Sequence, residues 1–207
     1  MIFSNTDQLK KAIDGILRIE GDSVRVLDEK KLRGSLVDHL VYSAVLSGDA
    51  GVKQAARWLI RRSGVTLGVL PSSIQSLYEA MGRGEAKGFT VPAINIRGLT
   101  YETAQAIFRA GIKGNVGPIL FEIARSEIGY TEQRPAEYAC AITAAAIKTG
   151  WRGPLFLQGD HFQIGVKKFA AEPQKEIDAV KELVREAVEA GFYNIDIDSS
   201  TVVDLSK

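Results

Sequence analysis

The second half of the chain alternates short apolar runs with longer helical stretches, and this alternation constrains the fold more than any other feature. Four runs are short enough to be buried strands, and they cover residues 89–96, 118–124, 154–160 and 194–198. The stretches between them have helical length and periodicity, and each leads to a glycine; they cover residues 100–110, 135–148 and 175–190. The order βαβαβαβ predicts a parallel sheet with helices packed outside it.

Polar residues stand at the ends of three of these predicted strands. They are Asn95 on the first, Asp160 with His161 on the third, and Asp196 with Asp198 on the fourth. Carboxylates are unfavourable in the interior of a buried strand, because burying a charge without a partner costs several kcal/mol. In a closed barrel or an open sheet alike, ligands bind beyond the carboxyl ends of the strands. We therefore expect a functional site there, and the alternation alone leaves barrel and open sheet both possible.

The first part of the chain has a different pattern. From Thr6 to about Ala80 the apolar residues recur at helical spacing, and we expect helices over roughly 7–17, 32–46, 52–60 and 71–81. The glycine-rich stretch 82–88 marks the change of pattern. The sequence thus predicts an all-helical N-terminal segment, residues 1–84, followed by an α/β segment, residues 85–207.

Composition excludes several classes of function. The 207 residues include 26 Lys and Arg against 25 Asp and Glu, a net charge of +1, so no overall field attracts nucleic acid or an anionic membrane. No apolar run approaches the roughly 20 residues that span a bilayer, and the N-terminus lacks the pattern of a signal peptide. Cys140 is the single cysteine, which excludes a disulfide framework. We expect a cytoplasmic protein that binds neither nucleic acid nor membrane.

The pair Asp160-His161 follows an apolar strand directly and has two interpretations. At a strand end, a turn can bring both side chains to the same opening, where one binds a metal and the other transfers a proton. Alternatively, the two side chains only cap neighbouring backbone groups, which is the commoner role for an isolated Asp-His pair. The pair by itself does not decide between them.

Four motifs in order favour the functional interpretation. They are Val91-Pro92-Ala93-Ile94-Asn95, Pro118-Ile119-Leu120-Phe121-Glu122, Gly159-Asp160-His161 and Ile195-Asp196-Ile197-Asp198-Ser199-Ser200. In order and in strand position they resemble the opening strands of the class II, metal-dependent fructose-bisphosphate and tagatose-bisphosphate aldolases. The resemblance covers about residues 88–200. It implies the first half, four β/α units, of a TIM (β/α)8 barrel.

The resemblance also implies roles for individual residues. His161 matches a zinc ligand, Asp198 a fourth-strand carboxylate near the metal, Asp160 the acid/base at the substrate hydroxyl, and Asn95 a substrate-binding amide. The implied cofactor is a divalent metal, zinc, which polarises the carbonyl of a phosphorylated ketose such as fructose 1,6-bisphosphate during aldol cleavage. The implied protein is a lyase of carbohydrate metabolism.

The chain departs from the family pattern in ways that keep an alternative open. Gln158 stands where the family has a histidine, and Ser199 where it has a glycine. A catalytic zinc site usually has three protein ligands, yet the only histidine besides His161 is His39, expected on a helix. Residues 119–130, and especially 122–130, also resemble the non-catalytic partner subunits of tagatose-bisphosphate aldolase. This resemblance favours the alternative of a non-catalytic accessory or truncated barrel subunit that binds a partner aldolase or a sugar phosphate.

The predicted half-barrel has consequences for partners. A complete barrel takes about 250 residues, so residues 88–207 would form roughly half of one and leave sheet edges unpaired. We therefore expect a homo-oligomer or a complementary C-terminal half-barrel. A weaker third alternative is an unrelated open α/β binding module. The pair Lys167-Lys168 could hold a phosphate near the opening, but a solvated loop is the commoner role for such a pair.

Overall fold

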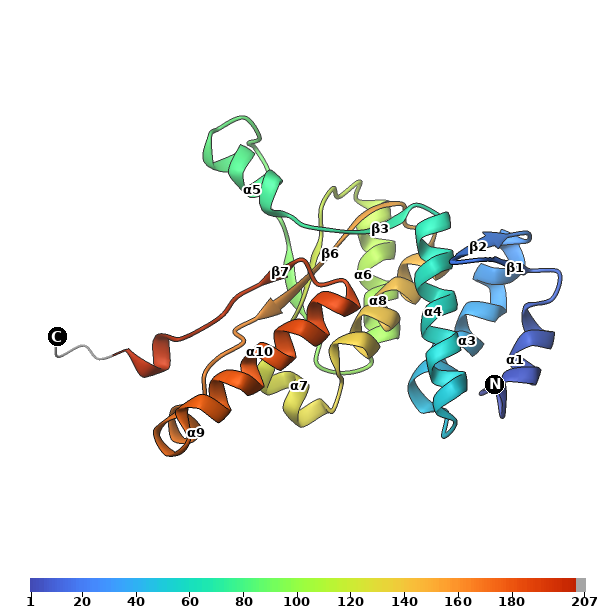
Figure 1. Cartoon of the computed structure of the whole chain (residues 1–207). Coiled ribbons are helices and arrows are strands. Elements are labelled where there is room, and N and C mark those ends of the chain that lie inside the picture. Colours follow the sequence, from blue (N-terminus) through green and yellow to red (C-terminus); the bar gives the residue numbers. More distant parts are fainter. Residues whose placement is uncertain (204–207) are drawn as a thin grey trace.

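A parallel sheet with helices stacked against one face forms the centre of the computed structural model, which describes residues 1–203 (Figure 1). The last four residues of the expected segment 85–207 lie outside the described residues. The sheet contains β3 (Val69–Ser72), β4 (Ala93–Asn95), β5 (Leu120–Ala124), β6 (Gly153–Asp160) and β7 (Asn194–Ile195). The α/β class predicted from the sequence is confirmed.

The four expected strands lie side by side in chain order. β4 pairs with β5, β5 with β6 and β6 with β7, and every pair is parallel. β6 is the longest strand of the sheet, and its edge opposite β5 is shared, with β3 along residues 153–156 and β7 along residues 158–159. The carboxyl ends of β4 to β7 therefore meet at one side of the sheet.

The three expected helices of this part are confirmed. They are α6 (Thr100–Lys113), α8 (Pro135–Thr149) and α10 (Pro173–Ala190). A proline opens α8 and α10, and both end at a left-handed glycine, Gly150 at φ 84° and Gly191 at φ 99°. Two short helices that the sequence did not indicate follow β5 and β6, namely α7 (Arg125–Thr131) and α9 (Val166–Ala171).

The expectation of an all-helical N-terminal segment is wrong. Helices do form, as α1 (Thr6–Ile13), α2 (Glu29–Lys31), the π-helix η1 (Leu32–Leu36), α3 (Val37–Leu46), α4 (Ala50–Thr66) and α5 (Gln75–Gly82). However, β1 (Leu17–Glu20) and β2 (Ser23–Val26) form an antiparallel hairpin around Gly21, whose φ of 58° suits a tight turn. Pro71, expected to open a helix, lies in β3, at a sheet edge where its missing N–H is tolerated.

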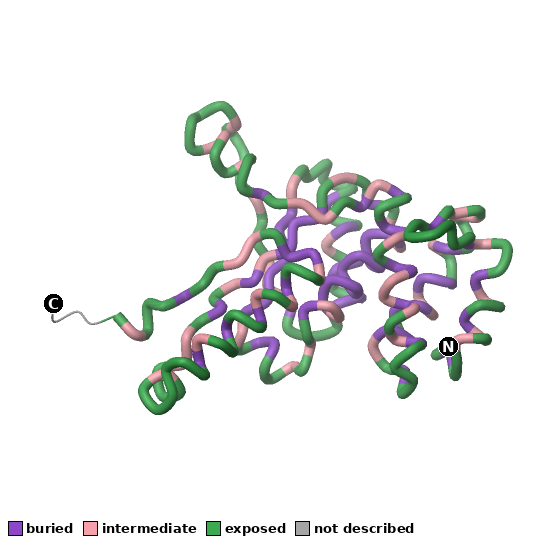
Figure 2. Tube along the Cα trace, viewed as in Figure 1, coloured by how far each residue is buried: buried purple, intermediate pink, exposed green. Residues whose placement is uncertain are grey.

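The main hydrophobic core lies between the sheet and the N-terminal helices, with α8 at its centre. This helix contacts α6, α10, α3 and α4, and its alanines from Ala144 to Ala146 are fully buried. Figure 2 shows buried residues gathered on the helices in the middle of the molecule. One cluster of buried side chains runs from Phe3 to Phe192, so it includes residues on both sides of residue 84. A Cβ on Gly64 would lie 2.7 Å from Cγ2 of Thr143, which shows how closely α4 approaches α8.

The two faces of the sheet differ in chemistry because side chains alternate along each strand. Phe121, Ile123, Leu155 and Leu157 point to the helices and belong to the main core. On the opposite face, the strand register aligns a polar row across the sheet: Asn95, Glu122, Gln158 and Asn194. Below this row, Leu120 and Phe156 form a small second cluster with Ile74.

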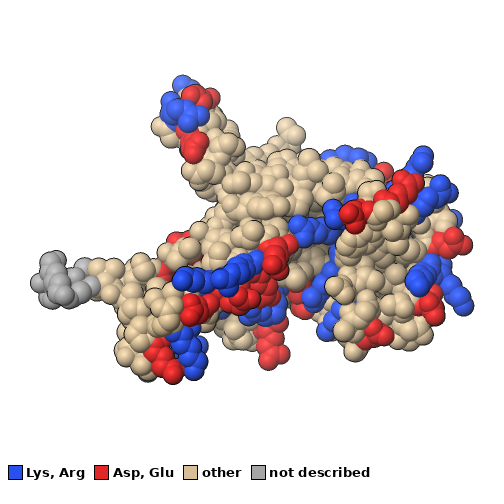
Figure 3. Space-filling model, in the orientation of Figure 1, with Lys and Arg blue, Asp and Glu red and all other residues tan. Residues whose placement is uncertain are grey.

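The outside of the molecule shows mixed charge. In the view of Figure 3, lysines and arginines are interspersed with aspartates and glutamates over the helices. α5 projects away from the sheet as a separate arm (Figure 1). Within residues 1–203, no helix combines the length and the apolarity needed to cross a membrane.

Candidate functional site

The backbone at the end of β6 holds His161 in an unusual conformation. Its φ is +46°, in the left-handed region that side chains other than glycine adopt at a cost of about 1 kcal/mol or more. Hydrogen bonds to the β7 segment continue on both sides of it. Asp196 N donates to Gly159 O at 2.8 Å, and Phe162 N to Asp196 O at 2.8 Å. These bonds offset the strain, so the imidazole is held at the opening beyond the strand ends.

Packing beneath the site supports this conformation. The ring of Phe162 is fully buried and lies over Gly159, where an added Cβ would come within 2.6 Å of the ring. Only glycine at this position leaves room for the aromatic ring. The sequence Gly159-Asp160-His161-Phe162 therefore forms one structural unit, in which the glycine and the phenylalanine fix the position of the two polar residues.

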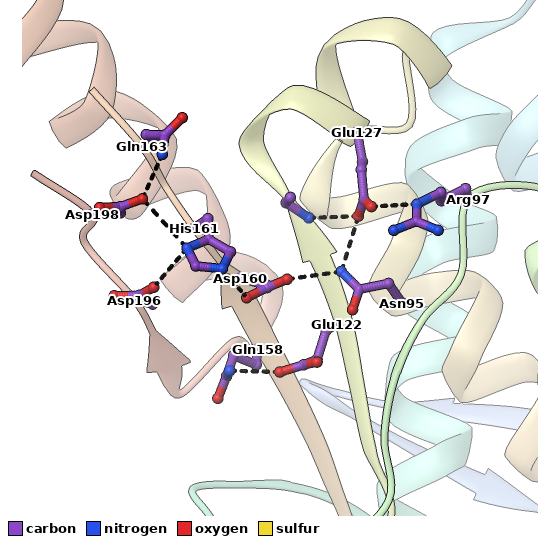
Figure 4. A network of polar contacts seen from close by, with 11 residues as sticks. Asn95, Arg97, Glu122, Glu127, Gln158, Asp160, His161, Gln163, Asp196 and Asp198 are labelled. Carbon is purple, nitrogen blue, oxygen red and sulfur yellow. Dashed lines mark hydrogen bonds and ion pairs between the residues drawn. The ribbon is translucent and has the colours of Figure 1, made fainter. Parts of the chain in front are cut away.

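Three carboxylates surround the imidazole of His161 (Figure 4). Its Nδ1 lies 3.3 Å from Oδ2 of Asp196 and 3.3 Å from Oδ2 of Asp198, and its Nε2 lies 3.6 Å from Oδ1 of Asp160. The imidazole is 62% exposed and Asp198 only 9% exposed. The site is therefore open to a ligand on the side of Asp196 and closed behind Asp198.

Asp198 is held as an anion. Hydrogen bonds from Ser200, and then from Gln163 and His161, lower the pKa of Asp198 to about 2. The backbone N–H of Ser200 donates to Oδ1 at 2.9 Å and Nε2 of Gln163 donates to Oδ2 at 2.7 Å. Each carboxylate oxygen of Asp198 thus accepts a hydrogen bond. These bonds hold the carboxylate in a fixed position, with Oδ2 3.3 Å from Nδ1 of His161.

A second group of contacts connects Asp160 to β4 and α7. Nδ2 of Asn95 donates to Oδ2 of Asp160 at 2.9 Å and to Oε2 of Glu127 at 3.1 Å. Glu127 also accepts from the N–H of Ala124 at 2.9 Å and pairs with Nε of Arg97 at 2.5 Å. Burial alone would raise the pKa of Glu127, but these hydrogen bonds outweigh it and the pKa is lowered. Asn95 is therefore held between two carboxylates.

Glu122 lies in the polar row beside this group. It is 8% exposed, and its Oε1 accepts a hydrogen bond from Nε2 of Gln158 at 2.6 Å. Burial raises the pKa of Glu122, and the nearby carboxylate of Asp160 raises it further. Glu122 thus keeps its proton to a higher pH than an ordinary glutamate.

The arrangement can hold a divalent cation. Asp160, His161 and Asp196 each offer one donor atom, and these three atoms lie within 4.8 Å of one another. Ligands about 2.0–2.2 Å from a zinc ion have comparable separations, and one imidazole with carboxylates is a common zinc donor set. A cation would also offset the repulsion between the carboxylates. These three side chains therefore fit a metal of the expected kind.

All four residues assigned from the sequence lie in this one region. Asn95 contacts Asp160, and both Asp160 and Asp198 approach His161. His39, expected on a helix, is in α3 and packs edge-on against Phe3. Asp196 was not predicted as a ligand, although its place near a strand end was visible in the sequence. Arg97, Glu122 and Glu127 were not predicted either, because only strand register and the docking of α7 bring them to this site.

Comparison with known proteins adds no assignment. No protein-family model, curated protein or solved structure matches this chain. Inferences about function therefore depend on the geometry of the site and on the sequence motifs.

Proposed function

We propose that this chain is a metal-dependent lyase of the class II aldolase type, which cleaves a phosphorylated ketose such as fructose 1,6-bisphosphate reversibly. The observation that carries the proposal is the convergence of Asp160, His161 and Asp196 at the carboxyl ends of β6 and β7. A cation-binding group at this end of parallel strands is the arrangement that metal-dependent barrel enzymes use.

The strand order supports a half-barrel. In an open doubly wound sheet the strand order reverses at a switch point, where ligands bind. Here β4, β5, β6 and β7 are neighbours in chain order without reversal, and β3, which precedes them in the chain, pairs with the start of β6 on the edge that β7 also uses. We propose that these four strands are the first half of a (β/α)8 barrel, with the polar row facing its interior.

Each side chain of the site has a separate role in the proposed reaction. His161 and Asp196 would hold zinc, which supplies polarisation of the ketose carbonyl. We assign Asp196 in place of Asp198, because both oxygens of Asp198 already accept hydrogen bonds and its carboxylate orients the imidazole. Asp160 exchanges a proton with the substrate hydroxyl through Oδ1, which lies 3.6 Å from Nε2 of His161, while Oδ2 accepts the hydrogen bond from Asn95.

Asn95 has a more specific proposed role than a general substrate amide. Its N–H groups are used by Asp160 and Glu127, while its Oδ1 has no hydrogen-bond partner among residues 1–203. The free oxygen can accept a hydrogen bond from a hydroxyl of the sugar. Asn95 would thus orient Asp160 and the substrate at the same time.

The first experiment measures zinc binding by calorimetry. The wild-type chain is expected to bind zinc, and His161→Ala to lose that binding. His39→Ala is the matched control, because His39 is the other histidine of the chain and lies in α3, away from the strand ends. Equal zinc affinity in wild type and His161→Ala would contradict the proposed metal site.

The second experiment measures zinc-dependent cleavage of fructose 1,6-bisphosphate in the active assembly. Asp160→Ala is expected to lower kcat by about 100-fold or more, the usual contribution of a general acid/base. Turnover like that of wild type in Asp160→Ala or His161→Ala would exclude the aldolase assignment.

One observation favours a second candidate function, that of an accessory subunit. The site contains a single histidine, and three members of the polar row, Asn95, Gln158 and Asn194, remain partly exposed. Such a face fits a subunit that completes its barrel with a second copy or a complementary half-barrel. Light scattering after size exclusion tests this candidate, since a well-folded strict monomer without a partner would count against it.

A further inference from the structure

A cavity of about 530 Å³ opens directly beside His161. Its walls come from three elements, with Arg125, Ser126 and Gly129 on α7, Lys167 and Lys168 on α9, and Glu176 on α10. The volume falls in the range of small-ligand sites, about 300–1,000 Å³. From the sequence, Lys167 and Lys168 could hold a phosphate, although a solvated loop is the commoner role for such a pair. The fold places both in the wall of this cavity.

Two of the cations in this wall are free to bind a ligand. Lys167 and Lys168 are exposed, and neither forms an ion pair with any residue between 1 and 203. Other lysines of the same region do have acidic partners, such as Lys175 with Glu172 at 2.8 Å. The two ammonium groups therefore give the cavity uncompensated positive charge.

Arg125 is a third cation, and it is held in place. Its Nη1 contacts Oε1 of Glu176 at 2.5 Å and the backbone oxygen of Gln163 at 2.7 Å, and its Nη2 contacts Oε2 of Glu176 at 3.2 Å. A guanidinium has five N–H donors, so these contacts leave others available. A prepositioned arginine is well suited to an oxyanion, because little side-chain freedom is lost on binding.

The only carboxylate in the wall is already neutralised. Glu176 is 3% exposed, and besides Arg125 it accepts the N–H of Gly165 at 2.7 Å. These contacts satisfy the carboxylate and fasten the loop after β6 to α10. Three cations against one carboxylate leave a net charge of +2 in the wall, next to His161.

We propose that this cavity is an oxyanion site that binds a phosphoryl group between Lys167, Lys168 and Arg125. That the phosphoryl group belongs to the substrate rests on the proposed function, whereas the anion site itself does not. A phosphate here would lie next to the metal-binding group, so a sugar phosphate could occupy both at once. The cavity has room for more than the phosphate alone.

The test titrates the chain of residues 1–207 with inorganic phosphate by calorimetry, in chloride buffer of constant ionic strength. Lys167→Gln combined with Lys168→Gln is expected to weaken phosphate binding about tenfold or more, because it removes two charge-assisted contacts. Lys10→Gln combined with Lys11→Gln is the matched control, since it removes two consecutive lysines from α1, on the opposite side of the molecule (Figure 1). This control should bind phosphate as wild type does.

A second pair of variants tests the cavity without touching the lysines. Ser126 is exposed in the wall, so Ser126→Glu places a negative charge in the cavity and should abolish phosphate binding. Ser126→Gln introduces an uncharged side chain of the same size as glutamate, and it should leave phosphate binding intact. Equal phosphate affinity in wild type, the double lysine variant and Ser126→Glu would overturn the site, as would a wild-type chain that binds no phosphate.

These titrations need neither metal nor sugar. Phosphate binding that the lysine variant loses would therefore support the anion site even if no cleavage were found. Conversely, suppose that the lysine variant cleaves the sugar in a zinc-dependent way and binds phosphate as wild type does. That result would agree with the lyase proposal and would exclude this cavity as the phosphate site.

Discussion

Nδ2 of Asn95 donates a hydrogen bond to Oδ2 of Asp160 over 2.9 Å, although β5 lies between their strands. Two strand spacings amount to about 9.6 Å, so the two side chains must lean toward each other above β5. The contact connects β4 to β6 on the polar face and brings Glu127 into the same group. The residues of this face therefore act as one site, and substitutions in it should have coupled effects.

Asn95→Ala is expected to destabilise the protein. The substitution removes the donor shared by Asp160 and Glu127, and the loss of hydrogen bonds to charged groups costs about 1–3 kcal/mol. Urea unfolding measures the change. Gln174→Ala is the control, because its amide donates to Asp178 on an exposed helix and should matter little. Equal unfolding midpoints for Asn95→Ala and wild type would show that the shared donor contributes nothing net.

Gly159→Ala should disturb the packing that supports Asp160 and His161. Its Cβ would clash with the ring of Phe162, and overpacking of this kind costs about 1–3 kcal/mol. Thermal unfolding should show a lower Tm, and Phe162→Leu added to Gly159→Ala should restore part of it. Gly117→Ala, where an added Cβ meets nothing within 4 Å, should be neutral. A wild-type Tm in Gly159→Ala would contradict the close packing described here.

Glu176→Gln should make stability less dependent on pH in acid. The hydrogen bond from Arg125, with that from Gly165, lowers the pKa of Glu176 below its usual 4.5 despite burial. A lowered pKa in the folded state contributes stability above pH 4.5 that is lost as the pH falls through the folded value. Wild type should exceed the variant by about 2 kcal/mol at pH 7, and the gap should narrow below pH 4.5.

The control for this measurement is Glu182→Gln, which alters an exposed ion pair with Arg185. Exposed pairs contribute little, so its unfolding curve should follow that of wild type at every pH. A gap for Glu176→Gln that stays constant between pH 7 and pH 3 would contradict a stabilising charge at Glu176.

Glu122→Gln should have the opposite effect. Burial, together with Asp160, raises the pKa of Glu122 in the folded protein above its usual 4.5. Ionisation of this group therefore opposes folding, with a cost that is absent below pH 4.5 and complete above the folded pKa. The variant should therefore be more stable than wild type at pH 8, and the difference should disappear at pH 3.5.

The same series of urea unfolding curves at several pH values measures this effect. The substituted amide still offers a carbonyl oxygen to Nε2 of Gln158, so the hydrogen bond seen at 2.6 Å can persist. A variant less stable than wild type at pH 8 would mean that Glu122 is stabilising when ionised, against the direction inferred from its burial.

The order of strands and helices after residue 88 could be predicted because the signals are local. Apolar runs of strand length and helical repeats ending at Gly150 and Gly191 are properties of neighbouring residues. The hairpin of β1 and β2 was missed because each strand has only four residues, too few to separate alternation from a continuing helix. β3 was missed because its Pro71 is also a common first residue of a helix.

The sequence by itself determined the parallel α/β architecture and the position of Asp160 and His161 at the end of a strand, since both follow from the pattern along the chain. Only the tertiary structure decided which side chains meet. The bond from Asn95 to Asp160 spans 65 residues and the pair of Arg125 with Glu176 spans 51. Such contacts depend on strand register and helix docking, which long-range packing sets and no local pattern encodes.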